Sequence, residues 1–235
     1  MNLFKRIEGV FFNPRPVFDG LAAKPVWVDA LIVILLALIV FNLVVVPYMQ
    51  KDQLELAKDN SALKKRLGEE NYNKRIQALI NPPTFGLYVQ TMVITVLIYI
   101  PALLLQGLIL LILGKFISTQ GTYVTVLSAL LHANLVDKLF GNAVRMVLAL
   151  TRKSVMQTST SLAMLFPKLE VNSTPFIILR QVDFFQLWLF GILAFGLAAV
   201  FKIELKKALF LSYGVWFLKA LVNIGFGMLG ASFYR

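Results

Sequence analysis

Residues 130–150 read LLHANLVDKLFGNAVRMVLAL, and this stretch decides how the whole chain folds. Most of its residues are apolar, yet it carries His132, Asp137, Lys138 and Arg145 within a segment long enough to cross a bilayer. A charged side chain near the bilayer centre costs at least ~2.5–3.5 kcal/mol and normally faces protein or water. We therefore expect these side chains to face other parts of the protein or a water-filled cavity, not lipid.

The polar residues of this stretch share one face of a regular helix. At about 100° per residue, Asp137 lies beside that face and His132 lies on roughly the opposite side. The face itself is formed by Asn134, Lys138, Gly141, Asn142 and Arg145. This spacing predicts a polar seam along one membrane span.

The composition is that of a polytopic membrane protein. Of the 235 residues, 58% are hydrophobic and 15% are charged, whereas soluble domains average ~45–50% apolar and ~25% charged residues. A helix that crosses the bilayer needs ~20 predominantly apolar residues. The sequence predicts an all-α fold, a five-helix transmembrane bundle, with spans at about 27–48, 85–116, 123–150, 184–201 and 208–233.

The predicted membrane domain covers residues 26–235. An N-terminal segment precedes it, and a polar loop lies within it. Residues 1–25 form an N-terminal amphipathic segment in the membrane interface, because Leu3, Ile7 and Val10 recur at helical spacing. A flexible tail is the alternative. Residues 49–83 form a polar loop with one or two helical pieces, either solvated or used to bind a partner.

Span two is longer than a straight crossing requires. A helix over residues 85–116 is ~48 Å long at 1.5 Å per residue, against a hydrocarbon core of ~30 Å. A helix break is predicted at Pro101 and Gln106, because proline donates no hydrogen bond to the carbonyl of Leu97. This is either a simple kink or a broken helix at a substrate site.

Span five carries two kinds of unusual residue. Lys219 and Asn223 are one turn apart and share a face. Close packing against another helix is predicted for Gly227, Gly230 and Ala231, because small residues four apart let two backbones approach.

Asp137 has to be paired or protonated if it lies in the membrane. Lys219 is its natural partner across helices, with Lys138 and Arg145 as competitors. The pair is interpreted either as a buried tie between spans three and five or as part of a hydrophilic cavity for an anionic headgroup, an ion or a proton.

Catalysis and metal binding have no support in the sequence. It contains no P-loop, dinucleotide fingerprint, nucleophile elbow or zinc-protease motif. His132 is the only histidine, cysteine is absent, and Asp137 lies off the face of His132. Asp183 is interpreted as the cap of a helix start. We therefore expect no catalytic residue, no metal and no cofactor.

The net charge of +11 predicts attraction to anionic lipid headgroups. The basic residues are dispersed and no nucleic-acid recognition motif occurs, so nucleic acid is not an expected partner. The segments that would lie outside hold more basic residues than those inside if the N-terminus is cytoplasmic, so charge alone does not orient the chain.

Three parts of the chain resemble the Yip family, the Ypt/Rab-interacting membrane proteins, in its prokaryotic branch. They are the Asp183-Phe184-Phe185 run with Trp188 and the glycine of FGLAAVFKI, the proline-containing approach FFNPRPVFDGLAAKPVWVDALIV, and the segment SLAMLFPKL. The resemblance implies five membrane helices with a cytoplasmic N-terminus. The Asp-Leu-Tyr-Gly-Pro motif of the Rab-contacting eukaryotic branch is absent, so we do not expect Rab binding.

These observations favour a non-enzymatic membrane scaffold or accessory subunit. Its expected partners are other membrane proteins or further copies of itself, and its expected location is a prokaryotic cytoplasmic membrane. The alternative is a small transporter or lipid-handling protein that uses the polar seam of span three.

Overall fold

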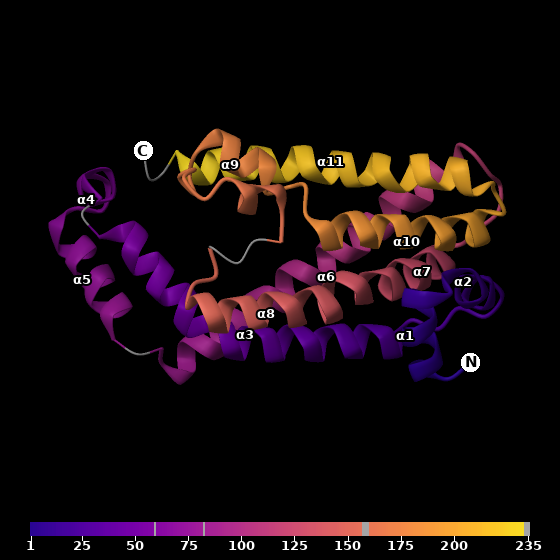
Figure 1. Cartoon of the computed structure of the whole chain (residues 1–235), viewed down its shortest axis with the longest axis horizontal. Helices are drawn as coiled ribbons and strands as arrows, with labels where there is room; N and C mark the ends of the chain where they lie inside the picture. Colours follow the sequence, from indigo (N-terminus) through magenta and orange to yellow (C-terminus); the bar gives the residue numbers. More distant parts are fainter. Residues whose placement is uncertain (59, 82, 157–159, 233–235) are drawn as a thin grey trace. The chain divides into compact units, whose positions relative to one another are not determined.

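The structure is a computed structural model that describes residues 1–58, 60–81, 83–156 and 160–232. Within these ranges every named element is a helix, and an isolated β-bridge joins Ser161 to Asp183. The described helices include five stretches long and apolar enough to cross a membrane, so the predicted fold class is confirmed. They are α3 (Val28–Ala57), α6 (Phe85–Lys115), the continuous run Tyr123–Arg152, α10 (Phe184–Phe201) and α11 (Leu205–Ala231) (Figure 1).

The chain divides into two compact units. Unit 1 consists of Met1–Ile39, Ile94–Asn142 and Phe184–Lys219, and unit 2 consists of Val40–Val93, Ala143–Asp183 and Ala220–Arg235. Several long helices begin in one unit and end in the other. Each unit is described below by itself.

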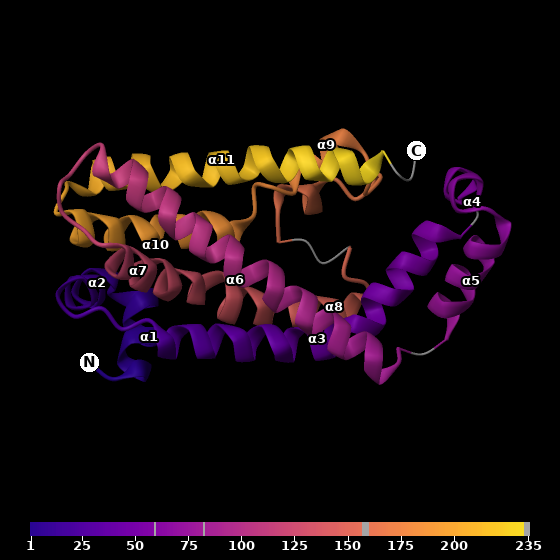
Figure 2. The same ribbon diagram turned by 180° about the vertical axis from the view of Figure 1, so that it is seen from behind.

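Unit 1 is built around α10, which packs against α7 (Tyr123–Leu135) and α2 (Pro14–Ala23). Figure 2 shows α10 alongside these two helices. Gly196 lies where the three meet, since a Cβ atom placed there would come within 2.9 Å of Ala129 Cβ and 3.0 Å of Phe18 Cδ1. The glycine of FGLAAVFKI thus permits a close approach of three helices.

The N-terminal segment, predicted over residues 1–25 as amphipathic, forms two helices. Asn2 caps α1 (Leu3–Phe12) by accepting a hydrogen bond from the Lys5 backbone N–H, and Pro14 begins α2. Proline is tolerated in the first turn of a helix, where no intrahelical donor is needed, and Pro14 and Pro16 both lie in the first turn of α2. The α2 side chains of Val17, Phe18 and Leu21 are buried in the core of unit 1.

An aromatic group surrounds Trp188 in unit 1. Its ring centroid lies 5.7 Å from that of Phe11, 6.2 Å from that of Phe140 and 5.8 Å from that of Phe184. Edge-on aromatic pairs at such distances add ~0.5–1.5 kcal/mol each beyond simple burial. The aromatic residues of α10 therefore attach α1 and the third span to the unit.

The third span is not a regular α-helix, which corrects the sequence analysis. It consists of α7, a π-helical segment η1 (Val136–Gly141) and α8 (Asn142–Arg152). The backbone N–H of Asn142 donates to the Asp137 carbonyl, five residues earlier, as a π turn requires. The seam expected from a uniform 100° rotation is therefore interrupted where Asp137 and Lys138 lie.

Helix α6 remains helical through Pro101 and Gln106, so the broken helix, one of the two predicted alternatives, is not found, and the simple kink stays a prediction. A membrane helix tolerates a proline because neighbouring groups satisfy the freed backbone atoms. The residues of α6 that are buried in unit 1 form one stripe, Leu103, Gly107, Leu110 and Gly114. Tyr123 lies against Gly107 and donates its hydroxyl to the Leu104 carbonyl at 3.0 Å.

Unit 2 contains the segment predicted as a polar loop. Helix α3 continues through Pro47 to Ala57, and α4 (Ser61–Leu67) and α5 (Glu69–Ile80) follow. The first residues of the expected loop are therefore helical, since only the proline N–H is missing from the ladder. The amide of Gln50 donates to the carbonyls of Ala78 and Asn81 at 2.9 and 2.7 Å, which fixes the end of α5.

The remaining elements of unit 2 are short. They are η2 (Leu162–Leu165) and α9 (Thr174–Leu179), which contact each other. The Asp52 carboxylate accepts from the backbone N–H groups of Val155 and Met156 at 2.6 and 2.9 Å. Helix α11 begins at Leu205, before the predicted start at 208, and the predicted last residue, 233, lies outside the described residues.

Candidate functional site

The central candidate site in unit 1 is the ion pair on the π-helical segment η1. Lys138 Nζ lies 2.7 Å from Asp137 Oδ2, and the Asp137 side chain is 1% exposed. The same ammonium lies 5.8 Å from the centre of the Tyr99 ring, over its face. Cation–π contacts of this kind are worth ~0.5–2 kcal/mol. Lys138 is therefore held between a carboxylate and an aromatic ring.

Tyr99 was not among the residues that the sequence pattern selected. Its hydroxyl oxygen is buried and has no hydrogen-bond partner among the described residues. Helical spacing relates residues within one helix, and Tyr99 lies in α6 whereas Lys138 lies in η1. The sequence pattern therefore could not indicate that the two side chains meet. Buried polar atoms usually have a partner, and an ordered water is the usual one when protein supplies none.

Lys219 forms a second polar contact in unit 1. Its Nζ donates to Gln186 Oε1 at 2.7 Å and lies 5.8 Å from the centre of the Phe190 ring. This contact joins α11 to α10, whereas the Asp137–Lys138 pair lies within η1. Neither contact joins Asp137 to Lys219, so that pairing stays a prediction.

Arg145 is bound in unit 2. Its Nη2 lies 2.9 Å from Asp183 Oδ1, and its Nε donates to Thr160 Oγ1 at 3.2 Å. The Thr160 hydroxyl donates in turn to Asp183 Oδ2 at 2.5 Å. The aspartate that resembles the family motif therefore has an arginine and a threonine bound to its two oxygens, beyond the capping role expected from its place before α10.

His132 lies in the interior of α7 and is fully buried. Its Nδ1 is 2.8 Å from the Ser128 carbonyl, so Nδ1 carries the proton and donates. Nε2 is buried without a partner among the described residues, and those residues contain no group of three metal-ligating side chains of the His, Cys, Asp and Glu type. His132 is accordingly placed as a packed helix residue.

The other predicted residues are distributed among several environments. Asn142 is buried, and Asn223 is exposed, although both were grouped with the intramembrane polar residues. In unit 2, a Cβ atom placed on Gly227 would come within 2.7 Å of Ile177 Cγ2 in α9, and Ala231 is buried. Gly230 has open space around it, so only part of the predicted packing motif is used in this chain.

A further ion pair was missed by sequence reasoning. Arg6 in α1 donates to Asp29 in the first turn of α3. Arg6 is 8% exposed, which is unusual for an arginine near the chain start. Helical periodicity does not relate the two residues, because they belong to different helices. Only the apolar residues around Arg6 indicated that its helix packs against other parts of the protein.

The described intramembrane charges thus have partners within their own units, and the described residues include five helices long and apolar enough to cross a membrane. Together these features define a polytopic integral membrane protein. A family model described as the Yip1 domain matches residues 9–227, so the chain belongs to the Yip1 domain family, as the resemblance in the sequence indicated. This family is not known as enzymatic. No curated protein and no solved structure matches the chain.

Proposed function

We propose that this protein is a non-enzymatic scaffold or accessory subunit that binds other membrane proteins. The observation that carries the proposal is the pairing of its intramembrane charges. Asp137 holds Lys138, Asp183 holds Arg145, and Gln186 holds Lys219. The Asp183 and Gln186 contacts join separate segments of the chain, whereas the Asp137–Lys138 pair lies within η1. Breaking a buried charged contact of this kind destabilises a fold.

The outer surface supports the same proposal. Only 17% of the apolar window of α6 and 22% of that of α11 is buried, against 72% for the span Tyr123–Arg152. Large side chains such as Leu97, Leu105 and Phe226 are therefore exposed along two membrane helices. Such faces contact either lipid tails or another membrane protein, and helix association in a bilayer depends on close packing.

Photo-crosslinking tests this proposal directly. A benzophenone amino acid replaces Leu97, Leu105 or Phe226 in turn, and cells are irradiated before the membranes are solubilised. The proposal expects a defined protein adduct from at least one of these positions, identified by mass spectrometry. An adduct with a second copy of the chain would assign the partner as a homo-oligomer.

The matched control uses the same variants, purified and reconstituted into liposomes at one copy per vesicle. Without a partner, the only adducts are with lipid. If native membranes also give lipid adducts alone from all three positions, the scaffold proposal is wrong.

A second candidate function is the handling of a lipid or ion, and the π-helical segment η1 favours it. π turns inside α-helices occur frequently at functional sites, and this one carries Asp137 and Lys138. Transport or lipid scrambling by purified protein in liposomes, lowered by Lys219→Ala or Asp137→Asn, would support this candidate. Wild-type-like folding with no activity in either assay would eliminate it.

The finer placement of the protein is also a proposal. We place it in the prokaryotic branch of the family and in a cytoplasmic membrane, with the N-terminus on the cytoplasmic side. The net charge of +11 supports contact with anionic headgroups, each exposed basic residue near the surface adding ~1 kcal/mol. Nucleic acid has no role in this proposal.

A further inference from the structure

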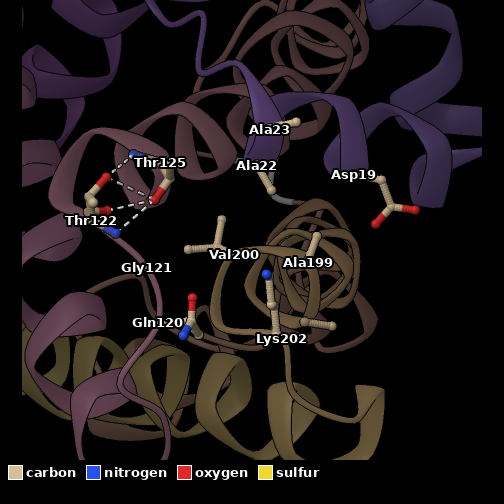
Figure 3. Close-up of a pocket in the computed structure, with 11 residues that line it drawn as sticks. Asp19, Ala22, Ala23, Gln120, Gly121, Thr122, Thr125, Ala199, Val200 and Lys202 are labelled. Carbon is tan, nitrogen blue, oxygen red and sulfur yellow. Dashed lines mark hydrogen bonds between the residues drawn. The ribbon is translucent and has the colours of Figure 1, made fainter.

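Unit 1 contains a pocket of about 650 Å³ that none of the assignments above uses. Its lining comes from three segments that are far apart in the sequence: the end of α2, the connection between α6 and α7, and the end of α10. This volume lies within the ~300–1,000 Å³ typical of small-ligand sites. Figure 3 shows the pocket with Asp19, Gln120 and Lys202 around Val200 and Ala199.

The position of the pocket follows from the topology. The three segments precede span one, join spans two and three, and join spans four and five. Because successive spans alternate in direction, all three connections of a five-span chain reach the same membrane surface. The pocket therefore lies where a lipid headgroup lies, at the ends of the membrane helices.

Two opposite charges line this pocket without being paired. Lys202 and Asp19 are both exposed, and neither has a hydrogen-bond or ion-pair partner among the described residues. The amide of Gln120 adds a donor and an acceptor. Between them the lining is apolar, consisting of Ala22, Ala23, Ala198, Ala199 and Val200.

The chain builds this pocket with constrained backbone. Lys202 has a positive φ of 52°, which ends α10 and sets the direction of its side chain. Gly121, at φ +85°, lies so close to Phe201 that a Cβ atom would approach its ring to 2.9 Å. The ammonium of Lys115 donates to the carbonyls of Thr119 and Gln120 at 2.8 and 3.2 Å, and Ser118 donates to the Phe201 carbonyl at 2.5 Å.

The surroundings are electrically biased toward an anion. Thr122 and Thr125 form a capping box at the first turn of α7, whose N-terminal end carries partial positive charge. Lys202 adds a full positive charge. A phosphate in this pocket would therefore find a cation, while Asp19 would repel a second negative group and attract an ammonium.

We propose that this pocket binds a zwitterionic phosphoethanolamine group, with the phosphate on Lys202 and the primary ammonium on Asp19. A primary ammonium has N–H donors that can bond a carboxylate, whereas the quaternary ammonium of choline has none. The site therefore distinguishes ethanolamine from choline headgroups. Its source is either a membrane lipid or a soluble phosphodiester, and this site is independent of the scaffold role.

Native mass spectrometry of the full chain in detergent tests the site. Phosphatidylethanolamine, phosphatidylcholine and phosphatidylglycerol with identical acyl chains are titrated separately. The expected result is at least about tenfold tighter binding of the ethanolamine lipid than of the choline lipid, the size of one charge-assisted hydrogen bond. Lys202→Ala lowers ethanolamine-lipid binding by a similar factor.

Asp19→Asn is the selective variant. It removes the preference for ethanolamine over choline and leaves binding of the phosphate unchanged. The matched controls are Lys206→Ala and Glu204→Gln, exposed residues of the same turn that do not line the pocket. Both are expected to bind the three lipids as the wild type does.

Soluble glycerophosphoethanolamine separates the two sources. Weak competition by this headgroup assigns the site to the lipid, and competition as strong as that of the lipid itself assigns it to the soluble phosphodiester. Equal binding of ethanolamine and choline lipids by wild type and Asp19→Asn overturns the proposal. So does a preference for phosphatidylglycerol that Lys206→Ala lowers as much as Lys202→Ala, because the attraction would then belong to the surface.

Discussion

The ring of Phe18 lies against Gly196. A Cβ atom added to Gly196 would come within 3.0 Å of Phe18 Cδ1. Phe18 is in the amphipathic N-terminal region and Gly196 is in the fourth membrane span, yet both are in the core of unit 1. The same added Cβ atom would come within 2.9 Å of Ala129 Cβ in α7. A segment expected to lie in the interface is thus part of the packing of the membrane domain.

Gly196→Ala is therefore expected to destabilise the protein. Over-packing a tight contact costs roughly 1–3 kcal/mol, and the measurement is thermal unfolding in detergent followed by circular dichroism. Gly225→Ala is the matched control, because its Cβ atom meets open space and alanine favours a helix by ~0.5–1 kcal/mol over glycine. Equal stability of the two variants would contradict the close contact.

Gly227 and Gly230 lie in the same helix, α11, and provide a second test variant with its matched control. Gly227→Ala is expected to loosen α9 from α11, because the new Cβ atom would approach Ile177 Cγ2 to 2.7 Å, whereas Gly230→Ala meets open space. In an Ile177→Ala background the effect of Gly227→Ala should fall by ~0.5 kcal/mol or more, as coupling between touching residues requires. Chemical unfolding of the wild type, Gly227→Ala, Ile177→Ala and the double variant measures the coupling. Strictly additive costs would show that the two residues do not touch.

Asp137→Asn is expected to reduce the stability of the folded chain by roughly 1–3 kcal/mol, the cost of removing one partner of a buried charged contact. Asparagine has nearly the same shape but no charge to hold the ammonium of Lys138. Asn223→Ala, a change at an exposed residue of span five, should have little effect. Unfolding in detergent compares the two, and a neutral Asp137→Asn would remove the structural role assigned to the pair.

The absence of cysteine makes the topology directly measurable. Single cysteines at Lys65 and Glu170 should react with a membrane-impermeant maleimide added outside intact spheroplasts. Cysteines at Lys24 and Glu204 should react only after the membrane is opened, because five alternating spans put these sites on the N-terminal side. The reverse labelling would keep the five spans and invert the proposed orientation, while mixed labelling within either pair would contradict five spans.

The polar helices of unit 2 give a test of pH dependence. Lys64 donates to Glu69 Oε1 at 2.8 Å, and this bond holds the pKa of Glu69 below its ordinary value of 4.5. The pair therefore contributes fully above that ordinary value and loses its contribution as the pH falls through the lowered pKa. The same bond raises the pKa of Lys64 above 10.5, so the contribution is also lost as the pH rises through that raised pKa.

The carboxyl carbon of Glu69, followed by NMR from pH 2 to 7, measures this shift. Lys64→Met should return the Glu69 titration to its ordinary value. If the titration does not move in that variant, Lys64 is not the cause of the shift.

The long apolar helices were predictable because a bilayer requires long apolar runs. Residues 184–201 of the fourth span coincide with α10, since polar residues border that run on both sides. The end of α3 at Ala57 was not predicted, because polarity was taken to end the helix at Tyr48. Polar residues end a membrane crossing, but they do not end a helix that leaves the membrane and continues in water.

The polar residues of the site were recognised more reliably than their partners. The cost of charge in lipid selected Asp137, Lys138, Arg145 and Lys219 without knowledge of the fold. Partner choice depends on helix register and neighbours, which one sequence does not contain, so Tyr99 and Gln186 were missed. The π turn at Val136–Gly141 has no compositional signature of its own, and it shifts every register argument that crosses it.

That π turn also allows the third span to lose one residue without changing its flanking faces. Deleting one residue from an ordinary α-helix turns everything beyond the deletion by about 100°. A π turn already contains one residue more than an α turn, so a deletion between Val136 and Gly141 closes it into α-helix and keeps both flanking faces in place. Closing the turn without a deletion would instead rotate α8 about its axis relative to α7. The π turn therefore places the extra residue of this span at the segment where its carboxylate and ammonium meet.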